Sequence, residues 1–340
     1  MSLPPDHPAV PSRRIGVLLV NLGTPDAPEA GAVRRYLGEF LSDRRVVEIP
    51  QIVWQPILRG IILRTRPKKS AHAYSLIWRE DGSPLAAITR EQARALEGAF
   101  GPQVIVDHAM RYGRPAIADR LRALKDQGCD RILLAPLYPQ YCAATTATAN
   151  DAGFAALAAM RWQPALRTLP PYHDDPDYIA ALKTSVEASL AALDFAPDAV
   201  IASFHGMPER TLHLGDPYHC HCRKTARLLG EALKETLGAR ELIVTFQSRF
   251  GRAKWLEPAT DTVLTALPAK GIRRIAIVAP GFSADCLETL EELAIRGRDT
   301  FLAAGGTDFA YLPCLNAGET GIEMLKKIVG RELAGWTAQP

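Results

Sequence analysis

The residues best suited to chemistry lie just after two apolar segments that are far apart in the sequence. One segment ends at His205, and the other is followed by Asp285, Glu288 and Glu292. Both segments have the composition of buried parallel strands, and open α/β sheets bind ligands beyond the carboxyl ends of such strands. The i, i+3, i+7 spacing of the carboxylates predicts that all three share one helix face. A neutral imidazole opposite them can handle protons, a divalent metal ion, or both.

Each of these residues also has an ordinary structural explanation. His205 alone would suit a hydrogen bond to a loop carbonyl. Asp285 would suit a helix N-cap, with Glu288 three residues later in an arrangement similar to a capping box. Glu292 would suit a solvated helix face. The choice between chemistry and structure therefore depends on the rest of the chain.

Strand-like and helix-like segments alternate along the chain, which predicts βαβ units and parallel sheets. Strands are expected at 15–21, 104–109, 131–136, 199–204, 242–247, 274–280 and 308–313. Helices are expected at 29–41, 84–99, 115–126, 176–193, 222–237 and 287–297. The stretch PPYHDDPD, residues 170–177, marks a joint. We expect two doubly wound lobes, residues 14–170 and 171–317, and a helix at 318–335 that packs back on the first lobe.

Composition and short motifs exclude several classes of protein. The 40 basic and 37 acidic side chains leave a formal charge of +3, too small to indicate a nucleic-acid partner. No stretch of about 20 apolar residues could span a membrane. The first 14 residues lack the apolar core of a secretion signal, so the six cysteines are expected to be reduced thiols of a cytoplasmic protein. No GxGxxG, P-loop, GxSxG or HExxH motif occurs.

Seven short segments resemble motifs of the ferrochelatases, the enzymes that insert ferrous iron into a porphyrin to make haem. In chain order they are GVLLVNLGTP (16–25), DGSPL (81–85), MRYGRP (110–115), LYPQY (137–141), SFHGMP (203–208), TFQSRFGRAKWLEPATD (245–261) and PGFSADCLETLEEL (280–293). The resemblance covers about residues 14–325 and is to the bacterial type without a carboxyl-terminal cluster extension. It implies a chelatase-like α/β fold: two Rossmann-like lobes, each a parallel sheet flanked by helices, with a cleft between them.

The resemblance also implies a reaction and the residues that perform it. Ferrous iron would be inserted into protoporphyrin IX with release of two protons, the terminal step of haem synthesis. His205 and Glu288 match the catalytic, metal-handling pair, and Asp285 and Glu292 would extend a conduit for metal ions or protons. His205 suits a proton acceptor or an iron ligand, because imidazole titrates near neutral pH. Which of His205 and Glu288 holds iron stays open at this point.

Three other functions compete with this interpretation. Coproporphyrin III could replace protoporphyrin IX as the porphyrin. A chelatase for another tetrapyrrole, with a different metal, would use a similar site, since imidazole and carboxylate ligands also suit zinc, cobalt and nickel. A tetrapyrrole-binding protein without turnover could share the same cleft.

A second set of matched positions is expected to line the porphyrin pocket. Gly23 would permit close approach of a flat ligand, although a tight strand–helix turn explains it equally well. Arg111 has a charge suited to a porphyrin propionate, and Tyr112 offers an aromatic edge to the macrocycle. The expected porphyrin-binding residues are Asn21, Leu22, Gly23, Thr24, Tyr74, Arg111 and Tyr112.

Residues 44–69 form an apolar segment framed by basic side chains. Such a segment can lie on an anionic membrane surface, and in the family this region forms a lip over the porphyrin pocket. A core helix with basic ends is the alternative. The residues expected to form the membrane lip are Trp54, Ile57, Leu58, Ile61 and Ile62. The protein is thus expected to be cytoplasmic and peripherally bound to a membrane, with neighbouring haem-pathway enzymes as further candidate partners.

The stretch HLGDPYHCHCRK, residues 213–224, invites a metal-site interpretation. The spacing of Cys220 and Cys222 differs from the CxxC spacing of zinc knuckles. Cys142 lies one residue from the position of an internal cluster ligand in some relatives, but a [2Fe–2S] cluster needs four ligands. We therefore expect no resident cofactor, with iron as the substrate, while metal binding by Cys220 and Cys222 stays open. Cys286, a histidine in some relatives, is expected to be a buried, inert thiol.

Overall fold

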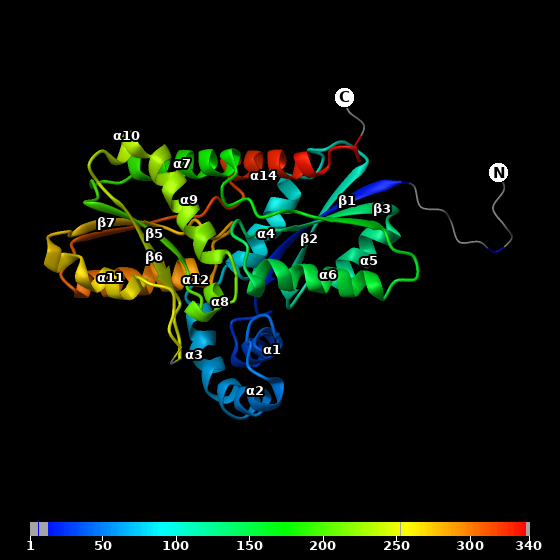
Figure 1. The fold of residues 1–340 in the computed structure, drawn as a ribbon, viewed down its shortest axis with the longest axis horizontal. Coiled ribbons are helices and arrows are strands. Elements are labelled where there is room, and N and C mark those ends of the chain that lie inside the picture. The colour runs from blue at the N-terminus through cyan, green and yellow to red at the C-terminus, as the bar shows by residue number, and fades with distance from the viewer. Residues whose placement is uncertain (1–5, 7–12, 252, 338–340) are drawn as a thin grey trace.

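Two four-stranded parallel sheets form the framework of the molecule (Figure 1). The computed structural model describes residues 6, 13–251 and 253–337. The strands are β1 (Arg14–Gly23), β2 (Val104–Tyr112), β3 (Cys129–Pro136), β4 (Ala165–Thr168), β5 (Ala199–His205), β6 (Leu242–Gln247), β7 (Arg274–Val278) and β8 (Asp308–Leu312). The first sheet has the order β2-β1-β3-β4 and the second β6-β5-β7-β8, so the second repeats the topology of the first. The predicted α/β fold class is confirmed.

Helices cover the sheets. They are α1 (Ala30–Phe40), α2 (Gln51–Ile57), α3 (Leu63–Ser75), α4 (Pro84–Ala95), α5 (Ile117–Asp126), α6 (Thr148–Ala158), α7 (Pro176–Ala191), α8 (Glu209–His213), α9 (Tyr218–Ala232), α10 (Lys234–Leu237), α11 (Thr260–Ala266), α12 (Leu287–Thr289), α13 (Arg298–Ala303) and α14 (Glu319–Glu332). Figure 1 shows α7 and α14 in a row above the sheets, α5, α6, α11 and α12 below them, and α1 to α3 projecting at the base. Three π-helical segments lie at Leu58–Ile62, Ala143–Ala147 and Leu290–Gly297.

The central strand of the first sheet is buried on both faces. In β1, Val17 and Leu19 join one apolar cluster, whereas Leu18 and Val20 join another. This follows from the unbroken apolar run in the sequence, because side chains alternate between the two faces of a strand.

One apolar core joins the two sheets. The cluster that contains Val17 and Leu133 of the first sheet also contains Val200 and Val278 of the second. Burial of this shared surface holds the sheets together. Residues that follow β1, β5 and β7 can therefore contribute to the same site.

Helix α14 contacts both halves of the molecule. Lys327 and Arg331 form ion pairs with Asp177, at the start of α7. At the same carboxyl-terminal end of α14, the Arg167 guanidinium of β4 donates a hydrogen bond of 2.6 Å to the carbonyl of Glu332. The carboxyl-terminal helix thus contacts the edge strand of the first sheet and also α7.

Two elements differ from the sequence-based expectations. The short strand β4 has no apolar run of its own, because it is the partly exposed edge of the first sheet. Residues 44–69 form α2, a π-helical segment and most of α3 rather than one helix. Within the described residues, every helix is too short or too polar to cross a bilayer. Most of the amino-terminal stretch, where no secretion signal is expected, lies outside the described residues.

Candidate active site

His205 is the last residue of β5, and the peptide that follows it is held at both ends. The Gly206 N–H donates to the Gln247 carbonyl (2.7 Å), and the Tyr218 hydroxyl donates to the His205 carbonyl (2.9 Å). A Cβ atom on Gly206 would lie 2.5 Å from the Gln247 carbonyl oxygen, so only glycine fits this close approach. The backbone therefore presents His205 in one defined position.

The His205 ring is oriented by its own loop. Its Nδ1 atom lies 2.7 Å from the Gly206 carbonyl oxygen, which can only accept a hydrogen bond. Nδ1 therefore carries the proton, and Nε2 keeps its lone pair for a proton or a metal ion. The ring is only partly buried, which leaves this second nitrogen accessible.

The acidic helix begins one residue later than the capping alternative predicts. Cys286, not Asp285, is the N-cap, and Thr289, not Glu288, completes the capping box. After the single α-helical turn of α12, residues Leu290–Gly297 continue as a π-helix. Such wide turns are frequent at functional sites. Glu288 and Glu292 remain neighbours across one turn, whereas Asp285 lies before the helix.

Glu292 is the carboxylate most strongly held near His205. Its two oxygens accept hydrogen bonds from the backbone N–H (2.8 Å) and the hydroxyl of Ser248. Burial raises the pKa of Glu292, and the charge of Glu288 acts in the same direction, while Ser248, His205 and Arg296 oppose the rise. The ionisable groups of His205 and Glu288 thus both act on Glu292, and the three belong to one site.

Glu288 lies between the second sheet and the first. Its backbone carbonyl accepts a 2.7 Å hydrogen bond from the Gln247 side-chain amide. Burial raises the pKa of Tyr36 and Tyr74, and the negative charge of Glu288 adds to both shifts. These tyrosines come from α1 and from the end of α3, so the Glu288 carboxylate acts on one residue on each side of the lip segment 44–69.

Asp285 has a structural environment rather than an open one. Its carboxylate accepts hydrogen bonds from Thr289 (3.0 Å), Tyr311 (2.5 Å) and the Asn316 side-chain amide (2.6 Å). The residue is buried, and these donors fill its oxygens. The expectation that Asp285 shares a helix face with Glu288 and Glu292 is therefore wrong, and Asp285 instead braces the β7–α12 loop against the loop after β8.

The positions expected to line the porphyrin pocket divide into two groups. Of these positions, the structure brings Tyr74 near Glu288, because the Glu288 charge acts on the pKa of Tyr74. The segment Asn21–Thr24 packs mainly on protein: the Asn21 amide donates to Thr89 (3.2 Å), and Leu22 is partly buried. Gly23 has φ +113°, and a Cβ there would lie 1.8 Å from the Tyr112 carbonyl oxygen. The tight-turn explanation accounts for Gly23 without a ligand.

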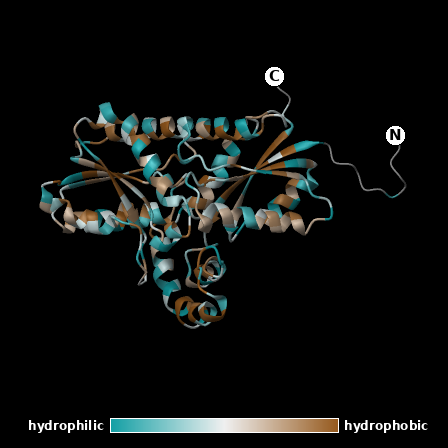
Figure 2. Cartoon of the chain, viewed as in Figure 1, coloured by the Kyte–Doolittle hydropathy of each residue, from teal (hydrophilic) through white to brown (hydrophobic). Residues whose placement is uncertain are grey.

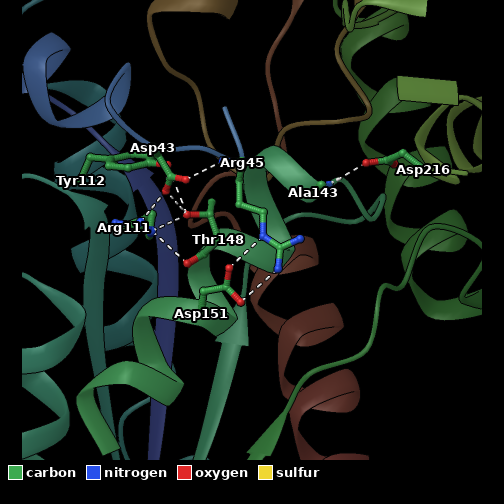
Figure 3. Close-up of polar contacts among 8 residues, drawn as sticks. All are labelled: Asp43, Arg45, Arg111, Tyr112, Ala143, Thr148, Asp151 and Asp216. Carbon is green, nitrogen blue, oxygen red and sulfur yellow. Dashed lines mark hydrogen bonds and ion pairs between the residues drawn. The ribbon is translucent and has the colours of Figure 1, made fainter. Parts of the chain in front are cut away.

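Arg111 and Tyr112 border a cavity of about 660 Å³. Figure 3 shows the polar contacts of both residues with Asp43 and Thr148. The Arg111 guanidinium donates to Asp43 (2.5 Å) and Thr148 (2.7 Å), and the Tyr112 hydroxyl donates to Asp43 (2.9 Å). Burial opposes ionisation of Asp43, but hydrogen bonds from the Thr148 hydroxyl, the Arg45 N–H and the Tyr112 hydroxyl, together with the Arg111 charge, lower its pKa. An internal carboxylate therefore already pairs with Arg111, the residue expected to bind a porphyrin propionate. The other lining residues are Glu39, Ser42, Arg44, Arg45, Glu48 and Asp151.

The expected membrane lip is apolar and exposed, but not at every predicted residue. Figure 2 shows the hydrophobic turn of α2 at the base of the molecule. Ile52 is 87% exposed and Ile61 58%, whereas Leu58 is 1% exposed. The exposed set is Ile49, Ile52, Val53, Ile57 and Ile61. Leu58 therefore belongs to the protein interior, since the bend at the π-helical segment turns it inward.

Trp54 and Ile62 are less exposed than the rest of the lip. The Trp54 indole N–H donates a 2.7 Å hydrogen bond to the Leu41 carbonyl, which ties α2 to the end of α1. Ile62 is half-buried. Both residues support the lip more than they extend its outer surface.

The cysteine and histidine stretch lies on α9 and does not gather its side chains. Cys220 is exposed and Cys222 is buried, since residues two apart on a helix point about 200° apart. His221 stacks on His173 at 3.6 Å. Within the described part of the chain, no three His, Cys, Asp or Glu side chains form a group that could hold a metal ion. Cys286 is buried at the helix start, where burial raises the pKa of its thiol.

Several residues of the site carried no separate signal in the sequence. Gln247 and Ser248 fall inside a quoted motif, but their bonds to Glu288 and Glu292 depend on the packing of β6 beside the acidic helix. Ser203 donates to the Gln247 side-chain oxygen at 2.7 Å and so supports the same contact. Asp43 stands in no recognisable motif.

Known proteins match both the sequence and the fold. A relative described as a ferrochelatase from Rhizobium meliloti (strain 1021) is 56% identical over 337 residues, 97% of this chain and 98% of its own length. Another, from Methylibium petroleiphilum, is 54% identical over 98% of this chain and 92% of its own length. The solved structure of SirB from Bacillus subtilis with Fe3+ matches with a TM-score of 0.55 at 14% identity, over 95% of this chain and 96% of its own, which shows a shared fold. The Ferrochelatase family model matches residues 14–333, and the chain belongs to the ferrochelatase family.

Proposed function

We propose that this ferrochelatase inserts ferrous iron into protoporphyrin IX and releases two protons. The observation that supports it best is the convergence of three groups from separate elements. His205 ends β5, whereas Glu288 and Glu292 follow β7. The charges of His205 and Glu288 both act on the pKa of Glu292. An imidazole with a free Nε2 beside two carboxylates provides both a proton acceptor and oxygen ligands for a divalent cation.

The contacts favour a different role in the reaction for each of the three residues. His205 takes a pyrrole proton on Nε2, because its Nδ1 is already protonated and bound to Gly206. Glu292 receives that proton, since its raised pKa favours the protonated carboxyl. Glu288 faces Tyr36 and Tyr74 and guides iron toward the ring. Two such proton transfers balance the charge of one Fe2+, and no electron is exchanged.

The lip supports protoporphyrin IX over coproporphyrin III as the substrate. The exposed residues Ile52, Val53, Ile57 and Ile61 form an apolar approach. A porphyrin with fewer carboxylates loses less hydration on crossing such a surface. A porphyrin with four propionates would find fewer free cations than expected, because Arg111 is paired with Asp43.

We also propose that the lip attaches the protein peripherally to an anionic membrane on the cytoplasmic side. The exposed Arg59, Arg64, Lys68 and Lys69 flank the apolar side chains, the arrangement of an interfacial helix. All six cysteines are free thiols, which supports a reducing compartment. Contact with other enzymes of haem synthesis would follow from a shared membrane surface.

The test is a competition between the two porphyrins without oxygen. Protein, ferrous iron and an equimolar mixture of protoporphyrin IX and coproporphyrin III are combined, and each metallated product is quantified. Preferential, multiple turnover of protoporphyrin IX supports the proposal. Preference for coproporphyrin III, or product that stops at one equivalent, contradicts it. The His205→Ala variant serves as the blank, expected to bind porphyrin but not to metallate it.

A further inference from the structure

One buried hydroxyl group, that of Tyr218, binds the peptide that follows His205. The peptide between His205 and Gly206 is fixed at its N–H by Gln247 and at its carbonyl by the Tyr218 hydroxyl. This peptide leads directly to the Gly206 carbonyl, which accepts from His205 Nδ1. Rotation of the peptide would move that carbonyl. Tyr218 thus acts on the peptide immediately before the carbonyl group that selects the tautomer.

Tyr218 is in turn anchored across the interface between the two halves of the molecule. Its backbone N–H donates to one oxygen of Asp216 at 3.0 Å. The other oxygen of Asp216 accepts a 2.7 Å hydrogen bond from the N–H of Ala143, the first residue of the π-helical segment that follows β3 (Figure 3). Asp216 therefore bridges this segment and the residue that holds His205.

A second contact reinforces the same interface. The Tyr141 N–H donates to His221 Nδ1 at 3.2 Å, one helical turn from Tyr218 on α9. The Gln140 amide donates to Thr225 at 3.0 Å, a further turn along the helix. The start of α9, and with it the Tyr218 ring, is thus fixed by the first half of the molecule.

We infer that Tyr218 is a positioning residue for the chelation reaction, which keeps the His205 imidazole in the Nδ1–H form and so leaves the Nε2 lone pair available. The inference rests on the proposed role of His205. Asp216 carries this constraint to the segment that begins at Ala143.

The test removes the hydroxyl and reads the tautomer. In Tyr218→Phe, the 15N signals of His205, assigned by their loss in His205→Ala, should shift from a single Nδ1–H form to a mixture of tautomers. Turnover should fall about tenfold, the worth of one well-placed hydrogen bond, with the KM for porphyrin within about twofold. Tyr172→Phe is the matched control, because Tyr172 is also buried and its hydroxyl has no partner among the described residues.

Two results would overturn the inference. One is an unchanged His205 15N spectrum in Tyr218→Phe, whatever the turnover; the other is an equal loss of turnover in Tyr172→Phe. If Tyr218→Phe does not fold, Asp216→Asn is measured in the same way, since it keeps the tyrosine ring; there, wild-type spectrum and turnover would refute the link. Full turnover of His205→Ala would instead refute the proposed role of His205. The two failures are distinguishable, because the 15N spectrum that reports the tautomer is recorded without any turnover.

Discussion

The Gln247 side-chain amide donates a 2.7 Å hydrogen bond to the Glu288 carbonyl and so ties the strand beside His205 to the start of the acidic helix. On its other side, the Gln247 side-chain oxygen accepts from Ser203, which lies on the same strand as His205. Gln247 therefore spans the two segments that carry the catalytic groups. The register of β5, β6 and β7 is what brings them within reach of one amide.

Replacing Gln247 by Met should test this connection, because the shape is kept and both hydrogen bonds are lost. The buried Ser203 hydroxyl and the Glu288 carbonyl would each lose a partner, which costs about 2 to 3 kcal/mol of unfolding free energy. Urea denaturation measures the loss. Gln127→Met, at an exposed position, should change stability by less than about 0.5 kcal/mol. Equal effects of the two substitutions would show that the Gln247 contacts contribute nothing particular.

The two glutamates of the acidic helix should differ in importance. Glu288→Gln removes the charge that faces Tyr36 and Tyr74, and we expect a large fall in kcat with a smaller change in porphyrin affinity. Glu292→Gln should lower kcat less, because an amide can still accept from Ser248. Steady-state kinetics with porphyrin titrations give both numbers. The reverse ranking would assign the reacting group to Glu292.

The raised pKa of Glu292 also predicts how stability depends on pH. A carboxyl whose pKa is higher in the folded state binds its proton more tightly there. Its stabilising contribution is present below the unfolded pKa and is lost as the pH rises through the folded pKa. Glu292→Gln cannot ionise, so its stability relative to the wild type should improve as the pH rises above the unfolded glutamate pKa of about 4.3.

The control for this pH dependence is a surface glutamate. Glu97 is exposed after α4, and Glu97→Gln should follow the wild type at every pH. Thermal or urea unfolding at matched ionic strength measures the differences. A flat difference between Glu292→Gln and the wild type would mean that burial does not perturb Glu292.

The exposed side of the lip should determine membrane binding. Changing Ile52, Val53, Ile57 and Ile61 to Ser removes only exposed side chains, so the fold should be kept. Binding to anionic vesicles should fall sharply, and the KM for a poorly soluble porphyrin should rise more than kcat falls. In the wild type, binding should weaken as salt rises, since each basic residue near the surface contributes on the order of 1 kcal/mol.

Co-sedimentation at low and high salt, with circular dichroism, measures this outcome. Leu58→Ser is the contrasting variant, because Leu58 is buried: it should lower stability rather than vesicle binding. A wild-type protein that never sediments with anionic vesicles would remove the membrane proposal and leave the lip as a porphyrin-facing element only.

The amino-acid sequence by itself determined the local elements and the two segments that carry the site. The apolar run that ends near His205 and the one that precedes Asp285 are both strands. A strand buried on both faces is recognisable from a short run of consecutive apolar residues, because successive side chains point to opposite faces. The seven motifs and their order along the chain were sufficient to identify the family. These features depend on short stretches of chain, so composition and spacing carry them.

Only the tertiary structure decided which polar groups are free to react. Asp285 and Glu292 are both carboxylates of the same motif. Tyr311 and Asn316 donate hydrogen bonds to the Asp285 carboxylate and so occupy its oxygens. Ser248 instead holds the Glu292 carboxylate beside His205. Arg111 is likewise occupied by Asp43, a residue 68 positions away. A hydrogen-bonding group can be satisfied by any element that packs against it. Its partner therefore depends on how distant segments meet, which residue spacing does not encode.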